Sequence, residues 1–153
     1  MAISSKGRSS AYFVPSKLGV NRDIYIKECI NKRLVPFIKK HHSDGNYIFW
    51  PDLAPAHYAI DTQNAMNRLN IKFVPKYLNP PAVPQLRPIE SFWAIYKRAI
   101  YENGWSANTP EELKKRATKV LKKFKPEIWR NLMRGVKKRF RRVAREGLSA
   151  LNN

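Results

Sequence analysis

The segment Phe49-Trp50-Pro51-Asp52-Leu53-Ala54-Pro55-Ala56-His57 places an acidic residue, Asp52, directly after a short apolar run. That run, Tyr47 to Trp50, has the composition of a short buried strand, and Pro51 ends it because proline cannot continue a central strand. The sequence therefore predicts a carboxylate at the end of a strand.

A second acid, Glu90, lies within Pro84-Gln85-Leu86-Arg87-Pro88-Ile89-Glu90-Ser91-Phe92-Trp93. Pro88 is favoured in the first turn of a helix, so we expect a helix to begin there. Its predicted inward stripe is Ile89, Phe92, Trp93, Tyr96 and Ile100. Glu90 lies off that stripe, which leaves its carboxylate outside the predicted core.

Both acids stand in a strongly basic chain. Of 153 residues, 30 are Lys or Arg and 11 are Asp or Glu, which gives a net charge of +19. Such charge favours a polyanionic partner, with nucleic acid as the first candidate and an acidic membrane surface as the second. No apolar stretch approaches the roughly 20 residues of a membrane span, and the N-terminus has no apolar signal core. The single cysteine, Cys29, excludes an internal disulfide and a cysteine-based zinc site.

Alternating strands and helices predict an α/β domain for the first two thirds of the chain. A long helix is expected from Asp23 to about His41, with a kink or break at Pro36. Residues 75–88 contain five of the 11 prolines and are expected to form an extended loop. The other expected elements are strands at Met1–Ile3 (a strand's tail), Ala11–Val14, Tyr47–Trp50 and Ile71–Val74, a Lys6–Arg8 turn and a helix at His57–Leu69.

After Gly104 the pattern becomes helical and basic. One helix is expected from Thr109-Pro110 with Leu113, Ala117, Val120, Leu121 and Phe124 inward. Another is expected from Pro126, with Ile128, Leu132, Val136, Phe140 and Val143 inward. Residues 111–145 hold 15 of the 30 basic residues, and an amphipathic helix here can dock on the domain and present cations to DNA phosphates. The predicted DNA-binding residues are Lys137, Lys138, Arg139, Arg141, Arg142 and Arg145. The same run also fits a solvated helix face or a nuclear-import patch.

Two carboxylates at the ends of different elements suggest divalent-metal chemistry. Mg²⁺ and Mn²⁺ prefer oxygen ligands, and a substrate phosphate can complete the coordination shell. In two-metal phosphoryl transfer the ions lie roughly 3.5 to 4 Å apart, so their ligands must converge from separate elements. Asp52 and Glu90 can meet that demand, although spacing alone does not bring them together.

Two motifs carry a resemblance to a known family. Asp52-Leu53-Ala54-Pro55-Ala56-His57 resembles the Asp-x-Ala-Pro-x-His motif of mariner-superfamily transposases. Arg87-Pro88-Ile89-Glu90-Ser91-Phe92-Trp93 resembles their Pro-Ile-Glu-x-x-Trp motif. The 37 residues between Asp52 and Glu90 are close to the spacing of that superfamily's second and third catalytic acids.

The resemblance implies an RNase H-like α/β catalytic domain of the Asp-Asp-Glu type, with a basic α-helical C-terminal tail. It implies metal-dependent cleavage and transfer of DNA strands in transposition, with Asp52 and Glu90 as catalytic residues that hold Mg²⁺ or Mn²⁺. It further implies transposon ends and target DNA as partners, a homodimer on DNA, no membrane association, and a nuclear location. We expect a partial catalytic domain over residues 1–104, and a basic helical extension over residues 105–153 packed on the same domain.

The chain departs from the family at its N-terminal side. The family's first catalytic Asp lies on a strand upstream of the segment that Met1–Arg8 resembles, so we expect the fold to be partial and its first strand to be missing. Without that strand, neighbouring strands would expose unpaired edges. The chain alone is therefore expected to be catalytically inactive and only marginally folded. The alternatives are a non-catalytic nucleic-acid-binding remnant of a domesticated or degenerate transposon, and a fragmentary gene product without function.

Several of these residues also have structural interpretations. Asp52 can act as a turn residue, and Glu90 can offset the helix macrodipole, although Arg87 at the cap position argues against a capping box. His57 is expected to form local hydrogen bonds, and His41-His42 to end a helix in solvent. All four tryptophans are expected in the core, with Trp50 and Trp93 bracing the two acidic sites.

Overall fold

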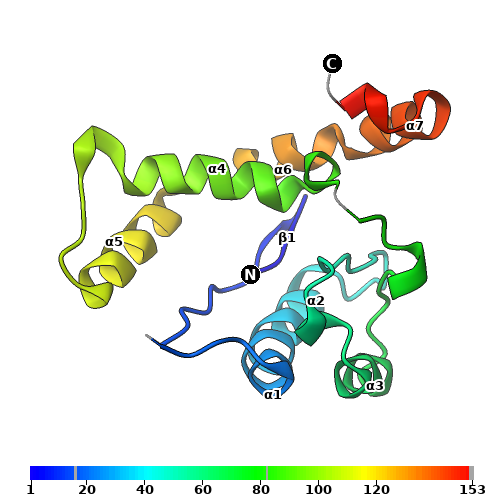
Figure 1. Cartoon of the computed structure of the whole chain (residues 1–153), viewed down its shortest axis with the longest axis horizontal. Helices are drawn as coiled ribbons and strands as arrows, with labels where there is room; N and C mark the ends of the chain where they lie inside the picture. Colours follow the sequence, from blue (N-terminus) through cyan, green and yellow to red (C-terminus); the bar gives the residue numbers. More distant parts are fainter. Residues whose placement is uncertain (16, 82, 152–153) are drawn as a thin grey trace. The chain divides into compact units, whose positions relative to one another are not determined.

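Residues 1–15, 17–81 and 83–151 are described by a computed structural model of the chain (Figure 1). Its contacts divide the chain into two units. The first comprises Met1–Ala2 and Arg8–Ala82, and the second comprises Ile3–Gly7 and Val83–Asn153. The last two residues of the predicted 105–153 extension lie outside the described ranges.

The long helix predicted from Asp23 is continuous through Pro36. It consists of α1 (Arg22–Ile24), a π-helical stretch η1 (Tyr25–Leu34) and α2 (Val35–His41). Asn21 caps its start by accepting a hydrogen bond from the Ile24 N–H. The N–H of Val35 reaches back to the Ile30 carbonyl, one residue further than in an α-helix. This wider turn lies directly before Pro36, which has no N–H to donate, so the predicted break does not occur.

Two of the expected strands meet, but only as a single bridge. Phe49 pairs with Phe73 in parallel, through hydrogen bonds from the Phe49 N–H to the Lys72 carbonyl (2.8 Å) and from the Val74 N–H to the Phe49 carbonyl (2.9 Å). The predicted strands over 47–50 and 71–74 are therefore adjacent. A longer ladder is not formed between them in the described structure.

The helix expected over 57–69 begins later than predicted. A 3₁₀ turn, η2 (Pro55–His57), precedes α3 (Ile60–Arg68). Asn70, with φ of +53°, ends the helical path in a left-handed conformation that Asn tolerates better than most residues.

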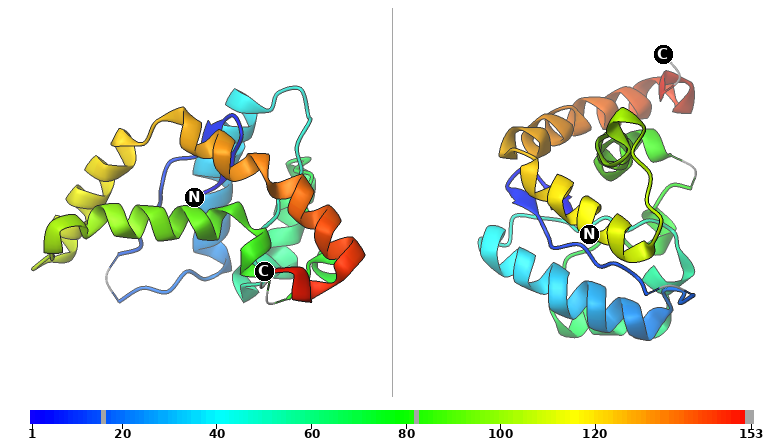
Figure 2. Two further views of the ribbon diagram at one scale, coloured as in Figure 1. Left: turned by 90° about the horizontal axis from the view of Figure 1, so that it is seen from above. Right: turned by 90° about the vertical axis from the view of Figure 1, so that its left-hand side faces the viewer.

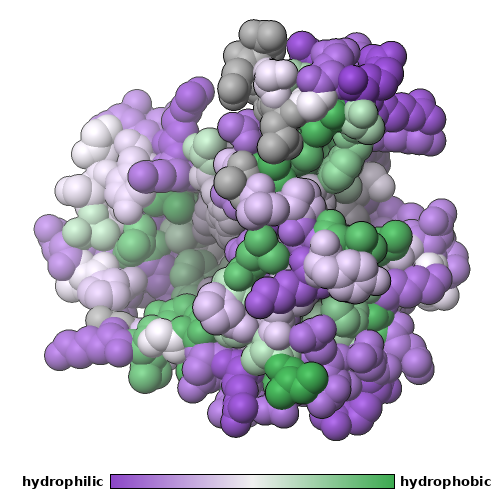
Figure 3. All heavy atoms as spheres, turned by 45° about the vertical axis from the view of Figure 1, so that its right-hand side comes forward, coloured by the Kyte–Doolittle hydropathy of each residue, from purple (hydrophilic) through white to green (hydrophobic). Residues whose placement is uncertain are grey.

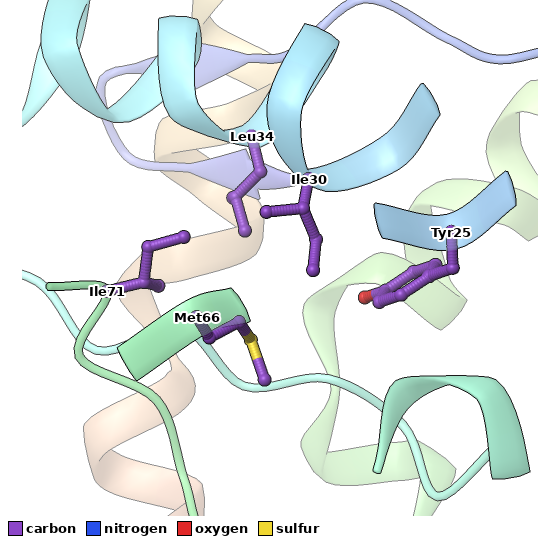
Figure 4. Packing of buried hydrophobic residues seen from close by; sticks show 5 residues of the cluster. All are labelled: Tyr25, Ile30, Leu34, Met66 and Ile71. Atoms are coloured by element: carbon purple, nitrogen blue, oxygen red, sulfur yellow. The ribbon is translucent and has the colours of Figure 1, made fainter. Parts of the chain in front are cut away.

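The core of the first unit lies between the long helix and α3 (Figure 4). Ile30 and Met66 have no exposed surface, and Tyr25, Leu34 and Ile71 are 5–7% exposed. These five side chains come from η1, α3 and the segment just after α3, so helical packing rather than a sheet supplies the unit's interior.

The strand expected at Ala11–Val14 is absent from the described structure. The chain there is not paired with another strand. Arg33 holds it instead, by donating to the Ala11 carbonyl (3.2 Å) and lying over the Tyr12 ring at 4.8 Å. An extended segment with apolar residues is thus docked by a side chain rather than by a ladder. The only sheet among the described residues is the short hairpin of β1 (Ile3–Ser4) and β2 (Gly7–Arg8), so the expected Lys6–Arg8 turn is its turn and second strand.

In the second unit the proline-rich segment leads into a helix at the expected residue. The segment contains two 3₁₀ turns, η3 (Lys76–Leu78) in the first unit and η4 (Pro84–Leu86) in the second, and α4 runs from Pro88 to Ile100. Phe92, Tyr96 and Ile100 are buried. Trp93, predicted on the same stripe, is 38% exposed, because a residue one position from Phe92 is rotated by about 100° around a helix.

Three further helices follow the short turn η5 (Glu102–Gly104). They are α5 (Pro110–Lys123), α6 (Pro126–Arg134) and α7 (Val136–Glu146), with a last 3₁₀ turn, η6 (Leu148–Leu151). The single helix expected from Pro126 is therefore two helices that meet at Gly135, a poor helix former. Phe140, predicted inward, is 38% exposed on α7.

An aromatic cluster joins α4 to the helices behind it. The ring of Phe92 lies 4.8 Å from that of Trp129 and 5.7 Å from that of Phe124. The Tyr96 hydroxyl donates to the Ala117 carbonyl at 2.8 Å. Trp129 is buried as predicted, and this cluster ties α5 and α6 to the helix that carries Glu90.

The fold is thus mostly helical with a small sheet, rather than a regular alternation of strands and helices. Hydrophobic periodicity placed the helices well. Strands depend on partners elsewhere in the chain, which local sequence does not show.

Candidate functional site

Asp52 lies in the irregular segment between the bridge residue Phe49 and η2, and its side chain is 48% exposed. Its Oδ1 accepts a hydrogen bond from the Ala54 N–H at 2.9 Å. The same oxygen lies 2.6 Å from Nδ1 of His57. The turn interpretation of Asp52 is therefore correct as far as its backbone contact goes, and the carboxylate still faces solvent.

His57 forms the local hydrogen bond that was predicted for it. The ring is largely buried, with 19% of the side chain exposed, and it lies against the Tyr25 ring with centroids 4.1 Å apart. Burial raises the pKa of the Tyr25 hydroxyl, which stays protonated at neutral pH. The imidazole is thus held between a neutral aromatic ring and the Asp52 carboxylate, and it fixes the direction of that carboxylate.

A buried amide that sequence analysis missed, Asn79, supports this segment from the other side. Its Nδ2 donates to the Pro51 carbonyl (2.8 Å) and to the Tyr58 hydroxyl (2.7 Å). Its Oδ1 accepts from the Trp50 indole N–H at 2.7 Å. Asn79 is 4% exposed, so one side chain contacts both flanks of Asp52. An Asn in a proline-rich segment is typical of a turn. No local sequence pattern indicates the three hydrogen bonds of Asn79.

Tyr58 extends this network to the predicted strand after α3. Its hydroxyl donates to the Val74 carbonyl at 2.8 Å. Trp50 therefore supports the Asp52 segment through a hydrogen bond to Asn79, whereas the expectation was support through packing. We call Trp50, Pro51, Tyr58, Val74 and Asn79 the Asn79 network.

Glu90 lies in the first turn of α4, and it is exposed. Arg87 occupies the cap position and makes no side-chain capping bond, in agreement with the expected absence of a capping box. Trp93, three residues on, is also exposed. Glu90 belongs to the second unit and Asp52 to the first, so their meeting at one metal site stays a prediction.

The ionisable side chains of the described residues form no cluster of three or more potential metal ligands. The two acids nevertheless have the chemistry that Mg²⁺ or Mn²⁺ selects, since each is an exposed carboxylate at an element's end. Separately, no helix in the described ranges is both long and apolar enough to cross a membrane.

The predicted DNA-binding residues lie on α7, and most of them face solvent. Lys137, Lys138, Arg141 and Arg145 are exposed, whereas Arg139 and Arg142 are partly covered. Arg142 is engaged by Glu146 at 2.9 Å. Figure 3 shows hydrophilic side chains gathered over the region of α7. A hollow of about 590 Å³ lies along this face, lined by the four exposed cations with Arg134 and Ala144.

His42 and the tryptophans correct two further expectations. His42 is 7% exposed and packs edge-on against Phe37, so it is not a solvated helix end. Trp50 and Trp105 are only partly buried and Trp93 is exposed, which leaves Trp129 as the one fully buried tryptophan in the described ranges.

Comparison with solved structures places this fold. The chain superposes on the Mos1 transposase catalytic domain with raltegravir and Mn at a TM-score of 0.71, with 21% identity over 89% of this chain and 68% of that one. The fold is similar to that of the Mos1 transposase catalytic domain. The crystal structure of the catalytic domain of Mos1 mariner transposase gives 0.68, with 22% identity over 86% of this chain and 64% of that one.

A third match is the Mos1 transposase paired-end complex with left transposon end. Its TM-score is 0.64 and its identity 18%, over 95% of this chain and 52% of that one. The chain thus spans about two thirds of the Mos1 catalytic-domain chains and about half of the chain in the DNA complex. No family model matches the chain, and no curated protein matches its sequence.

Proposed function

We propose that this chain is part of a mariner-type transposase catalytic domain, and that its chemistry is metal-dependent cleavage and transfer of DNA strands. One observation carries the proposal: a fold shared with the Mos1 catalytic domain in a chain whose Asp52 and Glu90 stand in two transposase-like motifs at family-like spacing. Either motif alone would be weaker support, because single acids at turns and helix starts are common.

Asp52 and Glu90 are proposed as two carboxylate ligands for Mg²⁺ or Mn²⁺. Mos1 catalytic-domain structures with Mn and with Mg support divalent-metal use in proteins of this fold. When bound, the metals would activate the attacking oxygen and stabilise charge on the phosphate. In this chain His57 and the Ala54 N–H hold Asp52 Oδ1 in place. Asn79 donates to the Pro51 carbonyl on one side of Asp52 and to the Tyr58 hydroxyl on the other.

DNA is the proposed partner, bound through the exposed cations of α7. Lys and Arg contacts to phosphates give salt-dependent, sequence-independent affinity. The Mos1 transposase forms a paired-end complex with the left transposon end. By extension we propose that this chain binds transposon ends and target DNA. We also propose that it assembles as a homodimer on DNA and is located in the nucleus. Residues 1–104 would carry the metal-binding acids, and residues 105–153 would carry the basic helices.

We propose that the polypeptide of 153 residues is inactive by itself. Its two assigned carboxylates, Asp52 and Glu90, would hold a pair of metal ions more weakly than the family's three catalytic acids. The second candidate function is DNA binding without catalysis. The observation that favours it is the cation-lined face of α7, which requires no metal.

Metal binding is tested directly by titrating Mn²⁺ into ¹⁵N-labelled protein with a short duplex present. We expect paramagnetic broadening of the amides around Asp52 and Glu90, and its loss at each site in Asp52→Asn and Glu90→Gln. Broadening confined to other acids, such as the exposed Asp44 or Glu127, would refute the assigned ligands.

Activity is tested by plasmid nicking in Mg²⁺ or Mn²⁺. We expect DNA binding without nicking from this polypeptide. Nicking that Glu90→Gln abolishes would overturn the proposed inactivity and confirm the catalytic assignment. If the reading frame continues upstream of Met1 into a strand bearing an Asp, we expect the longer protein to nick DNA. In that longer protein, Asp52→Asn and Glu90→Gln should each abolish nicking.

A further inference from the structure

Four lysines outside the predicted DNA-binding residues line one face of α5. They are Lys114, Lys115, Lys119 and Lys122, here called the α5 lysine face, and all four are exposed. With Thr118 and Glu111 they border a hollow of about 520 Å³. Their spacing places them on the side of the helix opposite Ala117, Val120 and Leu121, which are buried.

The one arginine of α5 makes contacts within the second unit, whereas the four lysines form no ion pair among the described residues. Arg116 donates to the Ile100 carbonyl at 3.2 Å and lies over the Trp105 ring at 5.4 Å. By contrast, the ion pairs found in the described part of the chain include no lysine of α5. The lysine face therefore makes no ionic contribution to holding the second unit together.

The lysine face also carries a local electrostatic cost. Lys115 and Lys119 are four residues apart and Lys119 and Lys122 three apart, so like charges are neighbours on the helix surface. Among the described residues that line the hollow, Glu111 is the only acid. Glu112 is occupied in the helix cap, where it accepts from the Asn108 N–H at 2.8 Å. A row of phosphates would relieve this repulsion.

We propose that the α5 lysine face is a second contact surface for the phosphate backbone of duplex DNA, separate from α7. The inference rests on the DNA binding proposed above. The face extends about 12 Å along the helix, which corresponds to roughly three to four phosphates of one DNA strand at one per ~3.4 Å. Lysine ammonium groups are mobile point charges without the fork geometry of arginine, so this contact is independent of base sequence.

The position of α5 within the second unit makes it an additional surface rather than an extension of α7. The two helices lie near opposite ends of α4, α5 at the C-terminal end and α7 at the N-terminal end (Figures 1 and 2). Since α4 has 13 residues, it is about 20 Å long. The two faces therefore contact different phosphates.

The test is the salt dependence of duplex binding by fluorescence anisotropy, from about 50 to 200 mM KCl with a random duplex of roughly 25 base pairs. Lys115→Gln, Lys119→Gln and Lys122→Gln are combined in one variant, since glutamine keeps helix propensity. The matched control combines Lys27→Gln, Lys39→Gln and Lys40→Gln, three exposed lysines of the first unit's long helix. A third variant combines Lys137→Gln, Lys138→Gln and Arg141→Gln on α7, and circular dichroism checks that each variant is folded.

We expect the α5 variant to lower the slope of log K against log[salt] by about 2 to 3, close to 0.9 for each lost contact. The control should change it by less than about 1. The α5 inference is wrong if the α5 and control variants change the slope of log K against log[salt] equally while the α7 variant lowers it. The proposed DNA binding would then stand. If the wild-type protein shows no salt-dependent duplex binding, both fail. The inference would also be overturned if the α5 variant lost binding to phosphatidylserine vesicles while its slope for duplex binding stayed unchanged. The α5 lysine face would then be a membrane contact.

Discussion

Replacing Asn79 by Ala should destabilise the first unit by about 3 kcal/mol. The side chain makes three hydrogen bonds of 2.7–2.8 Å, with Trp50, Pro51 and Tyr58, and each such bond contributes about 1 kcal/mol net. For a domain of 60–100 residues the expected fall in Tm is roughly 12–24 °C. Because the bonds flank Asp52, amide hydrogen exchange should also rise between residues 50 and 58.

The measurement is urea unfolding followed by circular dichroism and tryptophan fluorescence, with Asn64→Ala as the control. Asn64 is an exposed residue of α3, and its replacement by Ala should change the free energy of unfolding by less than about 0.5 kcal/mol. A loss in Asn79→Ala no larger than in the control would refute the view that this amide organises the Asp52 segment.

Asn79→Asp separates the donor from the acceptor role. The aspartate can still accept from the Trp50 indole, but once ionised it cannot donate to the Pro51 carbonyl or the Tyr58 hydroxyl. Burial with only the Trp50 indole as a donor raises the pKa of the aspartate above its unfolded value, so its destabilisation is largest at neutral pH. The stability difference between Asn79→Asp and wild type should therefore shrink as the pH is lowered toward about 4. A difference independent of pH would contradict the assigned donor bonds.

Three further predictions concern residues away from the carboxylates. Gly135→Ala, at a residue with φ −83° and ψ −9°, should stabilise the junction of α6 and α7 by about 0.5–1 kcal/mol once the flexible Arg139 side chain moves aside; a loss of stability in urea unfolding would contradict this. Hydrogen bonds from Lys32 and Arg33 lower the pKa of Glu28, so its stabilisation is present above the unfolded pKa of about 4.5 and lost as the pH falls through the folded value. Glu28→Gln should accordingly reduce the fall in the free energy of unfolding at acidic pH. An unchanged fall would argue against the hydrogen bonds from Lys32 and Arg33 to Glu28. Burial raises the pKa of the Cys29 thiol, so its reaction with a disulfide reagent at neutral pH should be slow and should accelerate in urea; equal rates in both conditions would show an open thiol.

Helix positions could be predicted from the sequence because their causes are local. Pro88 and Pro110 open α4 and α5 at the expected residues, since proline fixes the first turn and lacks only an N–H that needs no partner there. Periodicity likewise placed Phe92, Tyr96 and Ile100 in the core. It failed at Trp93 and Phe140, which lie at the margin of an apolar stripe where the neighbouring element decides burial.

The strands and the long helix show where local sequence is insufficient. Val-, Phe- and Tyr-containing segments at 11–14 and 47–50 have strand composition, but only Phe49 finds a partner strand in the described structure. Pro36 reads as a helix breaker, yet the π-helical turn before it keeps the chain helical. Both outcomes depend on hydrogen-bond partners that a sequence window does not contain.

For the candidate site, the two acids, their motifs and the basic character of the C-terminal helices could be predicted from residue types alone. These are properties of residue type and spacing. The sequence predicted a local hydrogen bond for His57, but the fold was needed to identify Asp52 as its partner and Asn79 as a second support of this segment. The fold was also needed to show that Arg116 donates to the Ile100 carbonyl while the lysines of α5 face solvent. The physical reason is that a hydrogen bond or an exposed charge depends on which atoms meet in space, and residues 28 positions apart in sequence, such as Pro51 and Asn79, meet only in the fold.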